Sequence, residues 1–187
     1  MFVRLNLNTT TMKKMKFLFG MLAIGGLLFT SCNNDDDSNT TPVDTSNGIA
    51  GAYNLVEFRT PNDTDINRDG TPHPNQMSET DCYNDSKLTF NADNTFTYAY
   101  RAVNVADGIG TCASATFTGT WQISGTSGST VNLAATYQNA SNQNVTLNLS
   151  KTGNRLTQTT LLAQYPNVNN DNVLVNSIGT VVLVFEK

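Results

Sequence analysis

From residue 51 onward, apolar residues recur at every second position of the chain rather than at every third or fourth. The clearest segments are Phe96/Tyr98/Tyr100, Phe117/Trp121/Ile123, Val131/Leu133/Ala135/Tyr137, Val145/Leu147/Leu149 and Val181/Leu183/Phe185. The positions between them are mostly Thr, Asn and Gln, so each segment has one apolar face and one polar face. Such alternation is typical of antiparallel strands that pack on one side. No segment has the period of an amphipathic helix, and the pattern predicts an all-β fold.

The pattern and the turn residues between segments predict about eight strands. The expected strands are residues 52–59, 86–91, 94–101, 115–124, 130–137, 143–150, 154–161 and 180–186. The connections at residues 60–85, 102–114 and 162–179 are long, and we expect loops there. In an up-and-down meander alternate connections lie at the same end. These loops would therefore share one rim, while tight turns close the opposite end.

The first 31 residues are typical of an export signal. Lys13, Lys14 and Lys16 precede an uncharged apolar run, residues 17–30, which is shorter than the roughly 20 residues that a membrane-spanning helix needs. The run ends in Leu28-Phe29-Thr30-Ser31-Cys32, which resembles the lipobox of bacterial lipoproteins. This resemblance implies a lipid on Cys32 that anchors the protein to the outer membrane. The alternative is an ordinary cleaved signal followed by an incidental cysteine.

Residues 32–50 are predicted to be a disordered, acidic tether. Asp35, Asp36 and Asp37 lie in a stretch of Asn, Ser, Thr and Pro, a composition that cannot build a packed core. An acidic cluster just after the lipidated cysteine resembles the export signal of surface-exposed lipoproteins in one Gram-negative phylum. We therefore expect an outer-membrane lipoprotein displayed at the cell surface. The alternative is a linker that only holds the domain away from the membrane.

Charge and chemistry exclude several classes of function. Without the first 31 residues the chain keeps seven basic against 15 acidic residues, a formal net charge of about −8. An acidic exported domain is a poor nucleic-acid binder, and we expect no nucleic-acid partner. His73, the single histidine, has no evident partner for acid–base chemistry, and no nucleophile elbow, His-Glu-x-x-His or phosphate-binding loop occurs. The sequence therefore favours a non-enzyme.

The cysteine count predicts one disulfide. If Cys32 carries lipid, Cys82 and Cys112 remain, and in an oxidising compartment they should pair. Two free thiols, or half of a metal site, are weaker alternatives because no further Cys or His is available. Each residue lies a few positions before a predicted strand, at the same rim, so the pairing also tests the meander.

One loop has the spacing of a calcium site. Asp65, Asn67 and Asp69 alternate before Gly70, as in an EF-hand-type loop, where oxygen side chains converge on one cation. The candidate ligands are Asp65, Asn67, Asp69, Thr71, Glu79 and Asp81. Gln76, however, stands where an EF-hand has its bidentate Glu, and no helices flank the loop. The loop is therefore either a structural calcium site or a solvated turn.

Several short motifs resemble one family when taken in order. They are Gly51-Ala52-Tyr53, Asp65-x-Asn67-x-Asp69-Gly70, Cys82, Leu88-Thr89-Phe90-Asn91, Asp93-x-Thr95-Phe96, Gly119-Thr120-Trp121 and Val184-Phe185-Glu186-Lys187. Together they resemble the lipocalin-like domain of bacterial lipoproteins, over residues 51–187. The resemblance implies a lipocalin-like (calycin) barrel of eight strands whose interior has room for one small apolar ligand. Tyr53 stands where lipocalins have Trp, and no helix follows the last strand, which leaves a smaller or flattened barrel as the alternative.

Aromatic side chains are the candidate lining of such an interior. They are Tyr53, Phe58, Phe96, Tyr98, Tyr100 and Trp121, and the same residues could instead fill a core. Glu57 and Arg59, expected on the face of Tyr53 and Leu55, would be either an internal polar pair or exposed rim charges.

Two hypotheses for function follow. In the first, the chain is a surface-anchored lipoprotein that binds a small or extended ligand at the loop-rich rim or in the barrel cavity. In the second, it is a non-catalytic accessory subunit of an outer-membrane assembly, and its barrel is fully packed. A cavity of roughly 300 Å³ or more that opens between the long loops would favour the first. A filled interior with an exposed apolar patch would favour the second.

Overall fold

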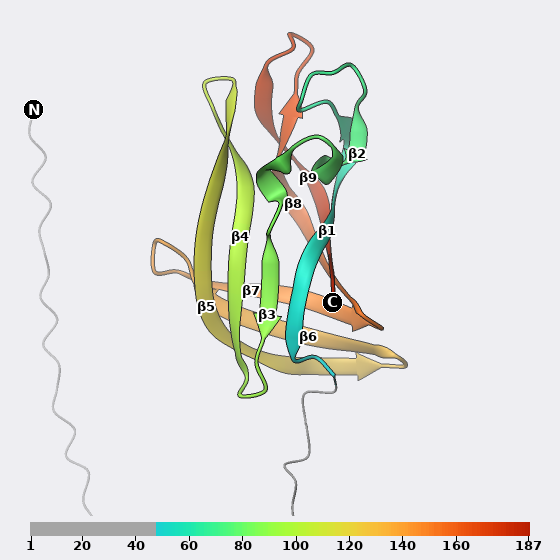
Figure 1. Ribbon diagram of the computed structural model, residues 1–187, viewed down its shortest axis with the longest axis vertical. Coiled ribbons are helices and arrows are strands. Elements are labelled where there is room, and N and C mark those ends of the chain that lie inside the picture. The colour runs from blue at the N-terminus through green and yellow to red at the C-terminus, as the bar shows by residue number, and fades with distance from the viewer. Residues whose placement is uncertain (1–47) are drawn as a thin grey trace, which may run out of the picture. The chain divides into compact units, whose positions relative to one another are not determined.

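The computed structural model describes residues 48–187 and is shown in Figure 1. Its strands are β1 (Gly51–Thr64), β2 (His73–Asn75), β3 (Lys87–Phe90), β4 (Thr95–Ala106), β5 (Ile109–Ser127), β6 (Thr130–Gln138), β7 (Asn144–Thr152), β8 (Arg155–Val168) and β9 (Leu174–Glu186). Two 3₁₀ turns, η1 (Gln76–Ser78) and η2 (Asp81–Tyr83), precede β3. No α-helix occurs in this range, and no helix there could cross a membrane. The predicted signal, Cys32 and most of the tether lie outside the described residues.

The strands form a closed barrel. Around the sheet the order is β1-β3-β4-β5-β6-β7-β8-β9, every neighbouring pair is antiparallel, and β9 pairs back onto β1. The short β2 adds to β1 as a flanking strand. Strands that follow one another in sequence are therefore neighbours in space. The predicted all-β meander and its eight-stranded, lipocalin-like barrel are confirmed.

One end of the barrel is closed and solidly packed. Phe90 is 1% exposed and contacts three other rings: Phe96 in a stack at 5.8 Å, and Tyr53 and Trp121 edge-on at 6.0 and 5.7 Å. The other fully buried side chains of this floor include Leu88, Leu133, Leu149, Leu156 and Phe185. Burial of this much apolar surface is the main source of stability in a barrel of this size.

At the opposite rim, two of the expected loops are strands instead. Residues 102–114 form the end of the β4–β5 hairpin, which pairs without interruption from Thr95↔Thr120 to Ala106↔Ile109. Asp107 and Gly108 form its turn, both with positive φ (51° and 76°), as a two-residue hairpin turn of type I′ requires. Residues 162–179 likewise extend the β8–β9 hairpin. The expectation of loops there was wrong, because the alternating pattern fades while the backbone pairing continues.

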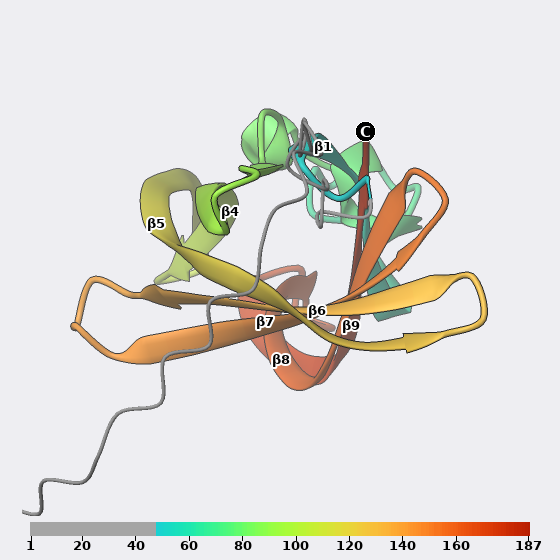
Figure 2. The same ribbon diagram turned by 90° about the horizontal axis from the view of Figure 1, so that it is seen from below.

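The β6–β7 hairpin runs across the foot of the barrel, whereas the β4–β5 and β8–β9 hairpins rise from it (Figures 1 and 2). The chain from Thr64 to Ser86, which holds β2, η1 and η2, lies beside their upper ends. Gly51, where β1 begins, lies at the closed end. The segments expected at the rim therefore do lie together, opposite the point where the described chain begins.

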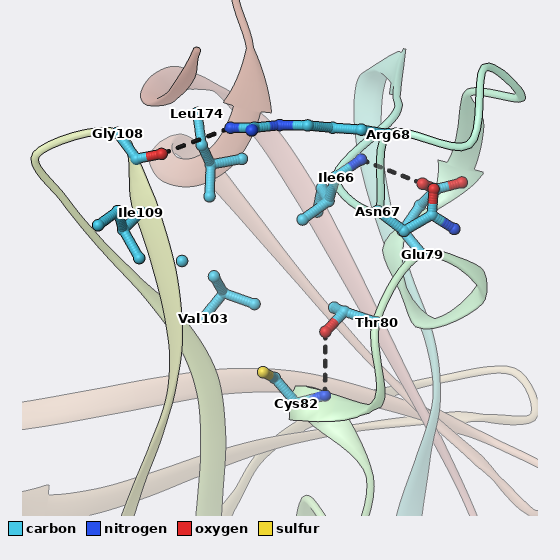
Figure 3. A pocket seen from close by; sticks show the side chains of 11 residues that line it. Ile66, Asn67, Arg68, Glu79, Thr80, Cys82, Val103, Gly108, Ile109 and Leu174 are labelled. Carbon is cyan, nitrogen blue, oxygen red and sulfur yellow. Dashed lines mark hydrogen bonds between the residues drawn. The ribbon is translucent and has the colours of Figure 1, made fainter. Parts of the chain in front are cut away.

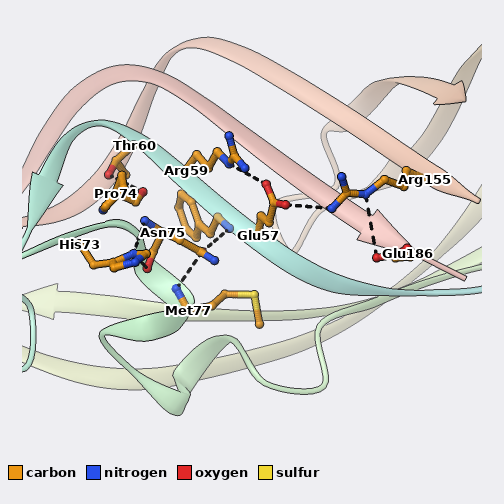
Figure 4. Close-up of polar contacts among 10 residues, drawn as sticks. Glu57, Arg59, Thr60, His73, Pro74, Asn75, Met77, Arg155 and Glu186 are labelled. Carbon is orange, nitrogen blue, oxygen red and sulfur yellow. Dashed lines mark hydrogen bonds and ion pairs between the residues drawn. The ribbon is translucent and has the colours of Figure 1, made fainter.

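A β-bulge in β1 decides which side chains enter the barrel. The register of β1 on β9 shifts between Leu55 and Glu57, so Phe58 packs inward. Glu57 faces outward, where its carboxylate pairs with Arg59 Nε at 2.6 Å and with Arg155 Nη2 at 2.8 Å (Figure 4). The expectation that Glu57 and Arg59 share a face with Leu55 was wrong because of this extra residue. Both charges lie on the outer surface, where the Arg59 side chain is exposed and the Glu57 side chain is half-buried.

Candidate functional site

The disulfide joins the rim segments as predicted. Cys82 in η2 and Cys112 in β5 are bonded, with their Cα atoms 4.9 Å apart. The bond holds η2 against the β4–β5 hairpin and so fixes the position of Tyr83, the next residue along the chain. The prediction of a pair at one rim is confirmed, and with it the meander on which that prediction depended.

Above the packed floor, the barrel mouth is hollow. Two adjoining cavities of about 150 and 200 Å³ share the side chains of Phe58, Tyr83, Tyr100, Ala102 and Gln164. These residues come from β1, η2, β4 and β8, so the space lies between the two upright hairpins and the η2 segment. We call the two cavities together the mouth pocket.

The aromatic residues predicted to line a cavity divide into two groups. Phe58, Tyr98 and Tyr100 line the mouth pocket. Tyr53, Phe96 and Trp121 are at most 4% exposed and belong to the floor. Along β4 the alternating aromatics change from packed Phe96 to Tyr100, which is 37% exposed. The strand therefore passes from the packed floor to the lining of the mouth pocket without a change in its alternation.

A buried polar network supports one wall of the mouth pocket, and sequence reasoning missed it. Gln76 is fully buried; its Nε2 donates to the carbonyl of Pro166 at 2.6 Å, and its Oε1 accepts from the Tyr83 hydroxyl at 2.7 Å. The Tyr83 ring in turn packs edge-on against Phe58, with centroids 4.7 Å apart. For Tyr83, the one available signal in the sequence was its position directly after Cys82. Gln76 stood out only as a departure from the calcium-loop pattern.

The mouth pocket is electrically neutral apart from one arginine. Burial raises the pKa of Tyr83, Tyr98 and Tyr100, so all three hydroxyls stay protonated at physiological pH. No Asp or Glu lines either cavity, and Arg101 is the sole charged lining residue among those that the structure describes. The pocket therefore presents aromatic faces and neutral hydrogen-bonding groups.

Several of those polar groups have no partner. Within residues 48–187, no hydrogen bond involves the Tyr100 hydroxyl or the side-chain amides of Asn104, Gln164 and Asn176. All four residues line the cavity of about 200 Å³. All four are exposed, so these polar groups are open to water and accessible to a ligand.

A second hollow lies above the mouth pocket, at the rim (Figure 3). This rim cleft has a volume of about 450 Å³ and shares Val103 with the mouth pocket. Arg68 crosses its upper side and donates to the carbonyl of Gly108 at 3.4 Å. Aliphatic side chains and exposed backbone form most of its walls, including Ile109, Gly110 and Leu174. The mouth pocket, with its aromatic rings, offers the more specific surface.

The predicted calcium loop is a compact turn. The Asp65 carboxylate accepts the backbone N–H groups of Asp69 and Gly70 at 3.0 Å, and Asp69 Oδ1 accepts that of Thr71 at 2.7 Å. Asp81 lies apart in η2 and accepts from Asn84. Within residues 48–187, no three His, Cys, Asp or Glu side chains converge as a metal site would need. That the loop binds calcium, with Asn67 and backbone oxygens among the ligands, stays a prediction.

Glu79 is the buried carboxylate beside this loop. It is 5% exposed and accepts the backbone N–H of Ile66 at 3.1 Å (Figure 3). Burial raises its pKa, and the charges of Asp65 and Asp69 raise it further, against the lowering effect of backbone N–H groups of Asn67 and Ile66. The folded state therefore binds a proton more readily here than the unfolded state does. Ionisation of Glu79 lowers the free energy of unfolding. This loss is absent below the pKa that Glu79 has in the unfolded chain.

Glu79→Gln is accordingly expected to raise the melting temperature at about pH 8, and the difference from wild type should vanish near pH 4. The glutamine oxygen retains the hydrogen bond from Ile66, so only the charge changes. Thermal melts from pH 4 to 8, in chelator, provide the measurement. If millimolar calcium reverses the sign at pH 8, the loop holds the ion; a destabilised variant in chelator would contradict the stated charge penalty.

His73 has only local partners. Its Nδ1 accepts the backbone N–H of Asn75 at 2.9 Å in an exposed turn of β2 (Figure 4). The Asn75 side chain meanwhile accepts from the backbone N–H groups of Phe58 and Met77. His73 thus stabilises the turn that positions η1.

Comparison with known families gives one result. The model of the family described as "Lipocalin-like domain" matches residues 49–158. No curated protein and no solved structure matches the chain. The matched range includes β1 through β7, the disulfide and the β4 side of the mouth pocket.

Proposed function

Because the chain belongs to the lipocalin-like domain family, we propose that it is a surface-anchored lipoprotein that binds a small, neutral ligand in the mouth pocket. A lipocalin-like barrel is typically a non-enzymatic binding fold. The observation that carries the proposal is the hollow lined by aromatic rings and accessible neutral polar groups, above a floor that is already packed. A ligand with an apolar ring and a few neutral hydrogen-bonding groups complements this lining.

The anchor and its orientation are part of the same proposal. A lipid on Cys32 would tie the chain to the outer membrane through the acidic tether. The described chain begins at the closed end of the barrel, next to β1. The mouth pocket would then point away from the membrane, where a ligand arriving from outside the cell can reach it.

The pocket is tested with N-phenyl-1-naphthylamine, a neutral aromatic probe that becomes fluorescent in apolar sites. Wild type is expected to bind it with a dissociation constant in the roughly micromolar range. Tyr100→Ala removes one aromatic wall and should weaken binding about tenfold or more. Ala102→Trp, which fills both cavities, should abolish binding while the floor stays intact.

Ile123→Ala is the matched control. Ile123 is 36% exposed, close to the 37% of Tyr100, but lies on β5 away from the mouth pocket. This variant should bind the probe as wild type does. Unchanged binding in Ala102→Trp would show that the probe binds elsewhere, and the mouth pocket would lose its assignment.

A second candidate function rests on a different observation. Leu161, Leu162 and Ile178 are 72%, 80% and 63% exposed on the β8–β9 hairpin. Exposed apolar groups of this kind mark protein contacts. They favour an accessory subunit of an outer-membrane assembly. In that case no probe should bind to the mouth pocket of the isolated protein.

A further inference from the structure

The barrel wall is incomplete in its upper half. From Ile109 to Thr118, β5 pairs with β4 on one side, whereas β6 begins to pair with β5 only at Gly119. Within residues 48–187, no strand occupies the other side of this stretch. At the tip, Leu174 lies against Gly110. The accessible part therefore runs from Thr111 to Thr118, and we call it the open edge.

In the described part of the chain, the edge of the upper half of β8 is also unpaired, but it is protected. The upper half of β8 pairs with β9 alone, but a bulge at Leu161–Leu162, where Leu162 has a φ of 55°, and Pro166 interrupt its edge. Bulges and prolines are the usual means of preventing strand addition. The open edge contains no proline, no charged residue and no bulge. It is therefore able to accept another strand.

The open edge is also held rigidly in an extended form. Twelve consecutive residue pairs join β4 and β5 without a change of register. The Cys82–Cys112 disulfide fixes the same stretch to η2. An edge that is already ordered loses little conformational entropy when it pairs, so its main-chain groups are ready for a partner.

We propose that the open edge pairs with the open edge of a second copy, antiparallel and about a twofold axis. Such an interface places each residue opposite the same segment of the partner, so any charged residue near the axis would lie close to the same charge on the second copy. Outside this stretch the chain is acidic, whereas Thr111–Thr118 is uncharged. Beside the lower end of the edge, a groove of about 310 Å³ lined by Thr118, Thr136 and Gln138 has room for side chains of the added strand.

The contact is expected to be weak. Every second residue of an antiparallel strand directs both backbone groups outward, so the symmetric pair gains about eight hydrogen bonds. The buried area of one strand pair is below that of a standard interface, and a dissociation constant of roughly 10⁻⁵ to 10⁻⁴ M follows. Confinement of the chain to a membrane by a lipid would raise its effective concentration.

Sedimentation velocity on the full chain carrying Cys32→Ser tests this. This parent protein, whose open edge is unchanged, should pass from monomer to dimer as its concentration rises through roughly 10⁻⁵ to 10⁻⁴ M. Thr116→Lys, which places a charge on the exposed face of the open edge, should weaken dimerisation at least tenfold. Thr120→Lys is the control, because Thr120 is also exposed on the same face of β5 but is flanked by Thr95 of β4 and Thr136 of β6.

Amide hydrogen exchange identifies the contact independently of any variant. In concentrated wild type, alternate amides between Thr111 and Thr118 should exchange at least tenfold more slowly than in dilute samples. A protein that stays monomeric, a dimer that survives Thr116→Lys, or protection confined to another surface would each overturn the proposal. A monomer whose open edge is protected only by an added extended peptide would show that the occupant is a different protein.

Discussion

Replacing Phe90 by alanine is expected to lower the free energy of unfolding by about 3–5 kcal/mol. Phe90 is 1% exposed and contacts the rings of Tyr53, Phe96 and Trp121 at centroid distances of 5.7 to 6.0 Å. These rings come from β1, β4 and β5, so the cavity would open where strands distant in sequence meet. Chemical denaturation gives the free energy, and the melting temperature should fall by roughly 10 °C.

Trp121 reports the same change spectroscopically. Its indole Nε1 donates to the carbonyl of Asn91 at 3.0 Å, next to Phe90. Loss of the Phe90 ring should admit water to the indole and shift its emission to longer wavelength. Phe90→Leu keeps most of the volume and should cost about 1.5 kcal/mol or less. Equal stability of Phe90→Ala and wild type would mean that the floor does not depend on this cluster.

The fold could be predicted because each strand carries its own evidence. Alternation and turn residues located all eight barrel strands, and the cysteine positions were consistent with consecutive strands as neighbours. The ends of the strands were harder to predict. Asp107-Gly108 is a strong hairpin signal, yet the residues on either side, such as Ala106 and Ile109, lack a clear alternation because both sides of that hairpin tip meet solvent.

The mouth pocket was predictable only in part, because two of its features arise from tertiary structure. The bulge after Leu55 turns Phe58 inward, and nothing local in the sequence specifies that extra residue. Gln76 acquires its role from the Pro166 carbonyl, which lies 90 residues away along the chain. Tyr98 and Tyr100, in contrast, follow from the alternation of β4 alone. Pattern therefore identifies which residues face inward, while packing determines where the core ends and the cavity begins.

Removal of the disulfide by Cys82→Ser with Cys112→Ser is expected to cost about 3–4 kcal/mol, from the entropy of the loop of roughly 31 residues that it closes. For a domain of this size the melting temperature should fall by roughly 10 °C. The loss should extend to ligand binding. Cys82 precedes Tyr83, whose hydroxyl donates to Gln76, and Gln76 donates to Pro166 in the opposite wall of the mouth pocket.

Release of η2 from β5 would therefore loosen Tyr83 and weaken naphthylamine binding as well as lower stability, even well below the melting temperature. Wild type treated with reductant should match the double variant in both measurements, which separates loss of the bond from any effect of the serines. Faster amide exchange should be concentrated in η2 and the β4–β5 tip, since the ring contacts of Phe90 in the floor are with Tyr53, Phe96 and Trp121. If stability falls but probe affinity does not, the Gln76 network alone positions Tyr83.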